Sequence, residues 1–559
     1  MSELLETLLR TVREDPPRGW FSTKAPDGRL VRRTWPEVHA DARRVAAGLR
    51  ARGIGRGDAV ALFMGSPADA ALAVQASWLV GASVTMLHQP TARTDLATYA
   101  ADTVGVLRMI SARALLLGAP YVEIAQHFAP AAAQAGAAVV PIADLLAGTE
   151  SLDADAGVAR EDDVALLQLT SGSTAAPKAV TITHRSLISN MRAMVVASEI
   201  TDDDIMISWL PIFHDMGMVG FLSVPMVFGF RLVKVTPADF VTSPTSWMQL
   251  ISDHAGTITA APNFAYGVAA RSLRKASGGL DLSSLRIALN GAEPIDADTV
   301  EAFCRAGARH GLRASSMLCA YGMAEAALAV SFAPLGRGMV LDVVDERKLS
   351  TERIAEPVSC AGGSAFALLG APLQGIEVEV RSENGSVLPE RHVGTLAIRG
   401  TAVTKGYLTT EGYLAAQDDD GWLDTGDEGY LCDGQIVVCG RVKDLLIFAG
   451  RNIYPTDIER AAERVEGVRR GNSAAVSIRE RGREGVVIVA ESRYHDDPEQ
   501  TRRIVHEVRL ATNAALEVRP SQVLLIPPGT LPKTPSGKIQ RARVRRELLQ
   551  RDGSGDAPA

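Results

Sequence analysis

The chain has 559 residues, a length that predicts roughly three to four domains or subdomains rather than one hydrophobic core. Hydrophobic residues make up 47% and charged residues 22%, with 50 glycines, a balance that favours an α/β enzyme over a fibre or a disordered scaffold. The formal net charge of −7 argues against nucleic-acid binding, which usually needs a basic surface.

Cysteine usage and the N-terminus point to the cytoplasm. The cysteines lack CxxC spacing, so we expect reduced thiols with neither a zinc site nor a disulfide framework; they are Cys304, Cys319, Cys360, Cys432 and Cys439. The N-terminal segment MSELLETLLRTVRED has no apolar core of the kind found in signal peptides.

Residues 70–87 contain no charged side chain, as a membrane span would. Gly81 and several polar residues interrupt this stretch, whereas a true span needs ~20 mostly apolar residues. The stretch therefore predicts a buried helix followed by a buried strand, and we expect no membrane insertion.

In chain order, apolar runs of strand length alternate with segments of helix length. Residues 59–64 precede 67–80, and residues 164–169 precede 185–198. This alternation predicts βαβ units and parallel sheets.

The pattern changes in the last third of the chain. Residues 376–400 alternate with a period of two about an Asn384-Gly385 turn, which predicts an antiparallel hairpin or small barrel. The segment after Asp444 predicts a small α+β domain, and residues 550–559 are expected to be disordered.

The most informative loop is LTSGSTAAPK at 169–178. It follows the predicted strand 164–169 and precedes a helix expected to begin near His184. Backbone N–H groups and hydroxyls in such a loop suit a polyphosphate, with Lys178 as the countercharge. It is not a Walker loop, because GxxxxGK[ST] is absent. Alone, it also fits a plain Ser/Thr-rich turn.

Six further motifs follow the loop. They are LPIFHDMG at 210–217, NGAEP at 290–294, YGMAE at 321–325, WLDTGD at 422–427, GRVKD at 440–444 and LPKTPSGK at 531–538. In this order they resemble the motifs of the adenylate-forming superfamily, which includes acyl-CoA synthetases, peptide-synthetase adenylation domains, luciferases and fatty acyl-AMP ligases. The resemblance spans residues 20–545.

The resemblance implies an α/β fold in two parts. A large N-terminal portion, residues 1–440, would hold two α/β subdomains and a small β-barrel. A hinge at 441–444, with Lys443 as the hinge residue, would lead to a smaller mobile α+β C-terminal domain, 445–549, that carries the catalytic lysine. A tail at 550–559 completes the expected organisation.

The resemblance also implies the site residues. Lys538, His214 and Glu325 are the expected catalytic residues, with Glu325 also holding Mg²⁺. The residues expected to bind ATP and AMP are Thr170, Ser171, Gly172, Ser173, Thr174, Lys178, Asn290, Gly291, Ala292, Glu293, Tyr321, Gly322, Met323, Ala324, Asp427 and Arg441. The expected acyl pocket consists of Trp209, Phe213, Met216, Met218, Phe240 and Phe264, with Tyr266 as a further candidate.

Each implied role has a physical basis. Tyr321 can stack on adenine, and Asp427 can accept both ribose hydroxyls with support from Arg441. Glu325 offers the oxygen ligand that Mg²⁺ prefers. Lys538 can meet the negative charge that builds between a carboxylate and the α-phosphate. Taken one by one, these residues would more often be core or solvated side chains. The ordered set of motifs favours a functional site.

Three alanines depart from the superfamily pattern. Ala175 and Ala179 stand where most members have glycine, so we expect a stiffer or differently bent loop. Ala324 replaces a threonine that is common in CoA synthetases.

Several segments resemble fatty acyl-AMP ligases and carrier-protein-loading relatives. They are HDMG at 214–217, PNFAY at 262–266, YGMAEA at 321–326 and RVKDLLIFAGRNIYP at 441–455. We therefore expect ATP-dependent activation of a fatty acid and transfer to the thiol of a holo-acyl carrier protein. Lys178, often missing from that branch, leaves a fatty acyl-CoA synthetase open as an alternative. Asp239 keeps an amino-acid-selecting domain open, and the two loop alanines keep open a non-catalytic acyl-nucleotide binder.

Overall fold

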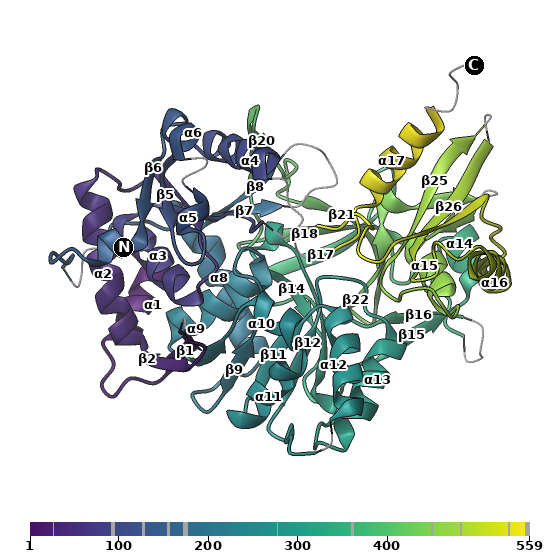
Figure 1. The fold of residues 1–559 in the computed structure, drawn as a ribbon, viewed down its shortest axis with the longest axis horizontal. Coiled ribbons are helices and arrows are strands. Elements are labelled where there is room, and N and C mark those ends of the chain that lie inside the picture. Colours follow the sequence, from purple (N-terminus) through teal and green to yellow (C-terminus); the bar gives the residue numbers. More distant parts are fainter. Residues whose placement is uncertain are drawn as a thin grey trace.

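The structure is a computed structural model that describes residues 1–25, 27–90, 96–125, 129–153, 157–170, 177–276, 278–358, 363–448, 451–480, 483–534 and 537–553. Some residues singled out in the sequence lie outside these ranges, namely Ser171, Gly172, Ser173, Thr174, Ala175, Cys360 and 554–559. Figure 1 shows the N-terminal elements at one end of the molecule and the last helices at the other.

The first large sheet has the strand order β20-β19-β8-β7-β4-β3-β5-β6 within the described ranges. Its strands are β3 (Ala59–Phe63), β4 (Ser83–Met86), β5 (Ala112–Leu117), β6 (Ala138–Pro141), β7 (Val164–Thr170), β8 (Lys178–Thr183), β19 (Gly406–Thr409) and β20 (Gly412–Ala415). Helices α2 (Trp35–Ala51), α3 (Pro67–Val80), α4 (Leu96–Met109), α5 (Val122–Ala125), α6 (Ala129–Gln134) and α7 (Ile142–Leu146) belong to the same region. Strands β3 to β7 pair in parallel, as the alternation predicted.

The second large sheet has the order β14-β13-β12-β11-β9-β10-β1-β2. Its strands are β1 (Trp20–Lys24), β2 (Leu30–Thr34), β9 (Ile205–Ser208), β10 (Arg231–Lys234), β11 (Ile258–Ala261), β12 (Ile287–Asn290), β13 (Met317–Gly322) and β14 (Ala329–Phe332). The helical segments are α1 (Glu3–Val12), α8 (His184–Ala197), η1 (Met216–Ser223), α9 (Val224–Phe228), α10 (Pro237–Thr242), α11 (Thr245–Asp253), α12 (Asn263–Lys275), α13 (Ala297–Ala308), η2 (Ala314–Ser316) and η3 (Ala324–Ala326).

An antiparallel sheet follows, in the order β17-β18-β21-β22. It contains β17 (Ile376–Arg381), β18 (Gly394–Gly400), β21 (Leu423–Cys432) and β22 (Gln435–Arg441), and beside it lie β15 (Leu341–Val344), α14 (Glu346–Thr351) and β16 (Ser364–Ala367). The predicted hairpin at 376–400 is confirmed by the antiparallel pairing of β17 with β18. Gly385 has φ 82°, the left-handed conformation that glycine allows at a turn.

The C-terminal segment has its own apolar core. Its elements are η4 (Val442–Asp444), β23 (Leu446–Phe448), β24 (Arg451–Ile453), α15 (Pro455–Glu463), β25 (Ser473–Glu480), β26 (Arg483–Glu491), α16 (Pro498–Leu516), β27 (Gln522–Ile526) and α17 (Arg541–Gly553). Because α17 extends to Gly553, the tail expected at 550–559 is wrong for its first four residues. The expected domain limits at 440, 444 and 549 stay a prediction.

One aromatic side chain of this segment is buried outside that core. Tyr454 is 4% exposed and packs in a cluster with Val344, Leu349 and Tyr430 of the antiparallel region. Its hydroxyl donates to Glu428 Oε2 over 2.5 Å. The C-terminal segment is thus anchored to the rest of the chain by a buried tyrosine.

Two local expectations can be compared directly. Residues 70–87 form the end of α3 and β4, and Gly81 with φ 80° ends the helix, as predicted. No helix in the described part of the chain is long and apolar enough to cross a membrane. The helix expected to begin near His184 is confirmed, because α8 begins at that residue. Strand β8, which lies between the loop and α8 and pairs antiparallel with β7, was not predicted.

Candidate active site

A cavity of about 2100 Å³, the main cavity, lies between the N-terminal portion and the C-terminal segment. Its walls come from both large sheets, the antiparallel sheet and the C-terminal segment: Thr170 and Lys178, residues 291–296, 320–325, 424–427, 440–441, 443–444 and 537–543 all line it. In α/β folds ligands bind at the carboxyl ends of parallel strands. The carboxyl ends of β11 and β12 lie at this cavity. The expected motifs therefore converge on one cavity.

The first corner of the cavity contains Asp427, Tyr321 and Arg441. The Tyr321 hydroxyl donates to Asp427 Oδ2 over 2.7 Å, and Arg441 Nε lies 2.8 Å from Asp427 Oδ1. Asp427 and Arg441 are cross-strand partners on β21 and β22. Burial raises the pKa of Asp427, and the Arg441 charge and Tyr321 hydroxyl oppose the rise. Each carboxylate oxygen keeps a second lone pair that can accept a ribose hydroxyl.

The turn after β12 supplies backbone to the same corner. Gly291 and Ala292 line the cavity, and a side chain at Gly291 would lie 3.0 Å from the Ala320 carbonyl oxygen. Ala292 has φ 70°, which is uncommon for a residue with a Cβ. Asn290 is fully buried and does not line the cavity, and its side chain donates to Asn263 Oδ1 over 3.1 Å. Glu293 Oε1 accepts from the Phe264 backbone over 2.5 Å.

Glu325 and Asp215 are half-buried acidic residues in the cavity wall. Burial raises the pKa of Glu325, with a smaller contribution in the same direction from Asp215. Tyr407 donates to Glu325 Oε1 over 3.2 Å. Carboxylate oxygens in this part of the wall fit a hard divalent cation such as Mg²⁺, which is usually shared with substrate phosphates.

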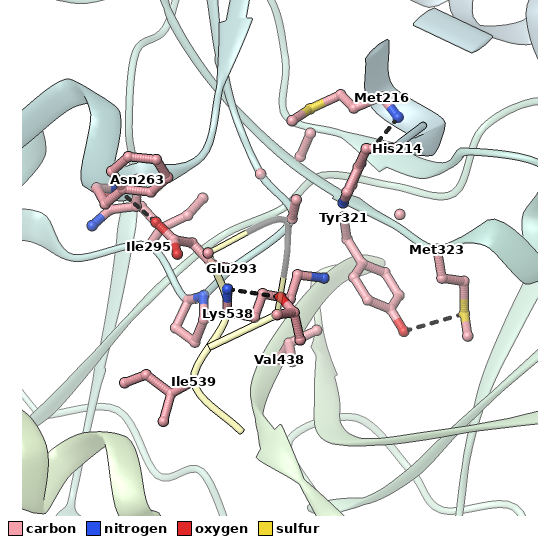
Figure 2. A pocket seen from close by; sticks show the side chains of 18 of the residues that line it. His214, Met216, Asn263, Glu293, Ile295, Tyr321, Met323, Val438, Lys538 and Ile539 are labelled. Carbon is pink, nitrogen blue, oxygen red and sulfur yellow. Dashed lines mark hydrogen bonds between the residues drawn. The ribbon is translucent and has the colours of Figure 1, made fainter. Parts of the chain in front are cut away.

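Lys538 comes from the C-terminal segment and faces acids of the N-terminal portion. Its positive charge acts on Asp215, Glu293 and Asp427, in each case against the effect of burial. The Lys538 backbone N–H donates to Thr534 Oγ1 over 3.0 Å. In Figure 2, Lys538 lies beside Glu293.

His214 lies across the cavity from Ile539 in the same view (Figure 2). Its Nδ1 is 2.5 Å from Asp215 Oδ1. Burial opposes ionisation of Asp215, but the facing His214 and Lys538 outweigh it and lower the pKa of Asp215. An anionic Asp215 thus connects His214 with the Lys538 charge.

The described flanks of the phosphate-binding candidate are Thr170 and Lys178. The Lys178 ammonium lies 5.6 Å from the centre of the Tyr407 ring. Ala179 lies within β8 and pairs with Leu169 in regular register. At this position an alanine is accommodated by extended backbone, so the expected bending does not arise there.

The candidate residues of the acyl pocket divide into those that line the main cavity and those that do not. Phe213, Met216, Phe240 and Phe264 line the main cavity. The others lie behind its wall, with Trp209 stacked on Phe240 at 4.0 Å, Met218 fully buried, and the Tyr266 hydroxyl donating to Leu289 O over 2.7 Å. Lys443, the expected hinge residue, is exposed within η4.

Sequence inspection missed an aliphatic extension of the cavity, here called the apolar branch. Its lining residues are Met194, Ser198, Ile200, Met206, Gly220, Phe221, Val224, Ile258, Ala260, Ile287, Leu289, Leu328 and Phe332. They come from α8 and its end, strands of the second sheet, and η1, whose π-helical turn is a feature often found at functional sites. The sequence signal that could have identified them is the spacing of two residues along β11 and β12, which places Ile258 with Ala260, and Ile287 with Leu289, on one face of the sheet.

His88 was also missed. It lines the cavity and packs edge-on against Phe213 at 5.4 Å between ring centres. Burial, helped by His214, lowers the pKa of His88 to about 4. It is therefore a neutral hydrogen-bonding group at neutral pH.

Basic side chains gather where α12 faces the C-terminal segment. Arg271, Arg274, Arg469 and Arg470 line this part of the cavity, and we call them the arginine rim. Burial lowers the pKa of Arg271, and the charges of the other three lower it further. Arg469 also pairs with Glu491 over 2.7 Å. Like charges this close favour an anionic ligand or partner.

Comparison with known proteins agrees with this geometry. The model of the family described as AMP-binding enzyme matches residues 14–408. The chain belongs to the AMP-binding enzyme family. A protein of Mycobacterium tuberculosis described as a ligase is 51% identical to this AMP-binding enzyme over 517 residues, covering 92% of this chain and 94% of that protein.

Other relatives have more specific names. A long-chain-fatty-acid–AMP ligase of Mycolicibacterium smegmatis is 35% identical, covering 70% of each chain. A medium-chain-fatty-acid–[acyl-carrier-protein] ligase of Moorena producens is 34% identical, covering 70% of this chain and 68% of that one. A solved structure from a study of fatty acyl-adenylate ligases of E. coli and L. pneumophila has a TM-score of 0.89 at 29% identity, covering 99% of both chains. The fold is therefore the α/β fold of adenylate-forming ligases.

Proposed function

We propose that this chain activates a fatty acid with ATP to an acyl-adenylate and pyrophosphate, and then passes the acyl group to the phosphopantetheine thiol of an acyl carrier protein. The observation that carries the first step is the continuity of the main cavity, which joins the Tyr321–Asp427 corner, Lys538 and the apolar branch. The names of the fatty-acid–AMP ligase and carrier-protein ligase relatives support the same substrate and acceptor.

In the first half-reaction, a carboxylate oxygen of the acid bonds to the α-phosphorus of ATP, and the bond to the leaving pyrophosphate breaks. Asp427 holds the ribose, and Lys538 meets the charge on the α-phosphate and the carboxylate. Glu325 would hold Mg²⁺, which supplies positive charge to the phosphate oxygens. His214 and Phe213 border the carboxylate end of the acyl site.

In the second half-reaction, the thiol sulfur attacks the acyl carbonyl carbon and AMP leaves with the bonding electrons. We propose that the C-terminal segment swings about Lys443 between the two steps and withdraws Lys538. Such gating by domain motion needs a few residues that absorb the backbone change. An exposed position in a short 3₁₀ turn suits Lys443 for this role.

The arginine rim supports a carrier protein as acceptor. Carrier proteins present an acidic helical surface, and surface charges of opposite sign steer association. Arg271 and Arg274 stand on α12, whereas Arg469 and Arg470 stand on the C-terminal segment, so a docked partner would contact both parts. Coenzyme A is the second candidate, because its phosphates could also bind to the rim, and Lys178 departs from the carrier-loading branch.

The experiment follows both half-reactions. Pyrophosphate release is measured with a panel of fatty acids, and acyl transfer is then compared between holo-carrier protein and CoA at equal thiol concentration. We expect acyl-carrier formation to exceed acyl-CoA formation. Equal or faster acylation of CoA than of every carrier tested would assign the protein to the CoA synthetases.

A charge-reversed rim tests the acceptor site separately. Arg271→Glu combined with Arg274→Glu should lower transfer to the carrier by about tenfold, while acyl-adenylate formation persists. The control is Arg305→Glu on α13, whose side chain is 75% exposed and lies outside the cavity lining. Unchanged transfer in the double variant would remove the rim from the acceptor site.

A further inference from the structure

The apolar branch follows one face of the second sheet. Met206, Ile258 and Ile287 are register neighbours on β9, β11 and β12 and form one row. Ala260 and Leu289 form a second row two residues nearer the carboxyl ends. Residues two apart on a strand share a face, and all five line the cavity. The branch therefore descends from the carboxyl ends of the strands toward their amino ends.

The rows give the depth of the branch. Gly291 lies at the corner formed by Tyr321, Asp427 and Arg441, here called the nucleotide corner. It is four residues beyond Ile287, which corresponds to about 13 Å at a rise of about 3.3 Å per residue. An extended alkyl chain with carbon–carbon bonds near 1.52 Å advances roughly 1.25 Å per carbon, so this depth accommodates roughly ten carbons.

The far end of the branch is formed by residues 198–200, here called the floor turn, which ends α8. Ser198 and Ile200 line the cavity there, next to Met194. Glu199 has φ 46°, and the Ile200 N–H donates to Val195 O over 3.2 Å. This geometry is typical of a helix that ends through a left-handed residue. The floor turn leads into β9, so it spans the bottom of the branch.

Arg286 holds the floor turn from outside the cavity. Its guanidinium donates to Ser198 O over 3.0 Å and to Glu199 O over 2.9 Å. It also makes two bonds of 2.7 Å to Asp204, which is 3% exposed and accepts from Thr257 Oγ1. A planar fork makes these four donations together, which an ammonium group cannot do. Neither Arg286 nor Asp204 lines the cavity.

We propose that the floor turn and its Arg286–Asp204 clamp set the upper length of the acid that the enzyme activates. The inference rests on the proposed function, because it takes the apolar branch as the site of the acyl chain. An acid of roughly ten carbons reaches the floor turn at this depth. A longer acid must displace the turn, which requires the bonds from Arg286 to Ser198 and Glu199 to break. Arg286 is therefore a positioning residue that determines chain length through the turn.

The test is a chain-length profile of pyrophosphate release with straight-chain acids from hexanoic to octadecanoic. For the unaltered protein we expect kcat/KM to rise by about tenfold for each two carbons up to the optimum, the value of two buried methylenes, and to fall for longer acids, which must displace the floor turn. Arg286→Lys keeps a charge opposite Asp204 and loses the carbonyl bonds, so the optimum should move to acids at least two carbons longer.

Two cavity variants test the path without touching the clamp. Ile287→Ala enlarges the cavity at the row of Met206, Ile258 and Ile287 and should also favour longer acids. Ala260→Leu fills the row of Ala260 and Leu289, which lies about 6.6 Å, or roughly five carbons, from Gly291. It should abolish activity on decanoic acid and lower activity on hexanoic acid much less. The matched control is Ile207→Ala, because Ile207 is fully buried, follows Met206 on β9 and points to the opposite face.

The outcomes separate two conclusions. If Arg286→Lys and Ile287→Ala both fold, by their thermal midpoints, and keep the unaltered profile, the inference is overturned while the proposed function stands. If the unaltered protein releases no pyrophosphate with any acid of the panel, the proposed function fails first. A profile that Ile207→Ala shifts as far as Ile287→Ala would also overturn the inference.

Discussion

Removal of the Asp427 carboxylate is the sharpest test of the nucleotide corner. Asp427 is 5% exposed and accepts from Tyr321 over 2.7 Å. If it also accepts ribose hydroxyls, Asp427→Ala should weaken ATP binding by about 1.5–3 kcal/mol, or roughly 10–150-fold in Kd. The ion pair with Arg441 adds little to this figure, because the Arg441 side chain is 59% exposed.

Tyr321→Phe is the matched control for this substitution. It removes the hydroxyl that donates to Asp427 but keeps the ring, so the loss should stay at about 0.5–1.5 kcal/mol. The assay is calorimetric binding of ATP, 2′-deoxy-ATP and 3′-deoxy-ATP. The unaltered protein should prefer ATP to both analogues, whereas Asp427→Ala should bind all three alike. A variant that still discriminates against the deoxy nucleotides would refute the ribose role.

Three further predictions concern lysines and the acceptor. Lys538→Ala should slow pyrophosphate release by about 10²-fold or more with little change in ATP binding, because one preorganised charge at a transition state is worth this much. Isotope exchange measures the release and calorimetry measures the binding. Near-normal pyrophosphate release would reject the catalytic role of Lys538. Burial lowers the pKa of Lys234 from 10.5 to about 7. The buried ammonium therefore lowers the free energy of unfolding by its full amount below pH 7, and this loss disappears as pH rises toward 10.5. The stability difference between Lys234→Met and the unaltered protein should therefore shift by about 2 kcal/mol between pH 8 and pH 10 in urea unfolding, and a constant difference would contradict the pKa. Acyl transfer to a carrier protein should weaken with added salt, because the arginine rim is exposed; salt-independent transfer would argue against a charged docking surface.

The sequence predicted the fold class well because its signals were local. Alternating apolar segments predicted the parallel strands, and the Asn384-Gly385 turn predicted the β17–β18 hairpin. Strand β8 was missed even though Val180 and Ile182 alternate with Thr181 and Thr183. The expectation of a phosphate loop that leads into a helix took precedence over that period-two pattern.

The site was predicted as residues but not as contacts. Tyr321 and Asp427 were both selected, yet their hydrogen bond joins positions 106 residues apart, and no spacing rule gives that register. The apolar branch was missed for another reason. Ile258 and Ile287 are ordinary buried aliphatic residues by type, and residue type alone does not tell which core side chain borders a cavity. Aromatic residues such as Trp209 were favoured instead and pack behind the wall.

The burial of Tyr454 has a consequence for the timing of catalysis. A swing about Lys443 would first have to extract this ring from its cluster and leave Glu428 with Arg353 as its remaining partner. Re-exposure of a buried side chain of this size costs about 1.5–3 kcal/mol. A difference of a few kcal/mol leaves the swung form at roughly 0.1–10% of the population. If the proposed swing occurs, Tyr454 would act as a latch that keeps the adenylate enclosed until an acceptor binds and shifts that balance.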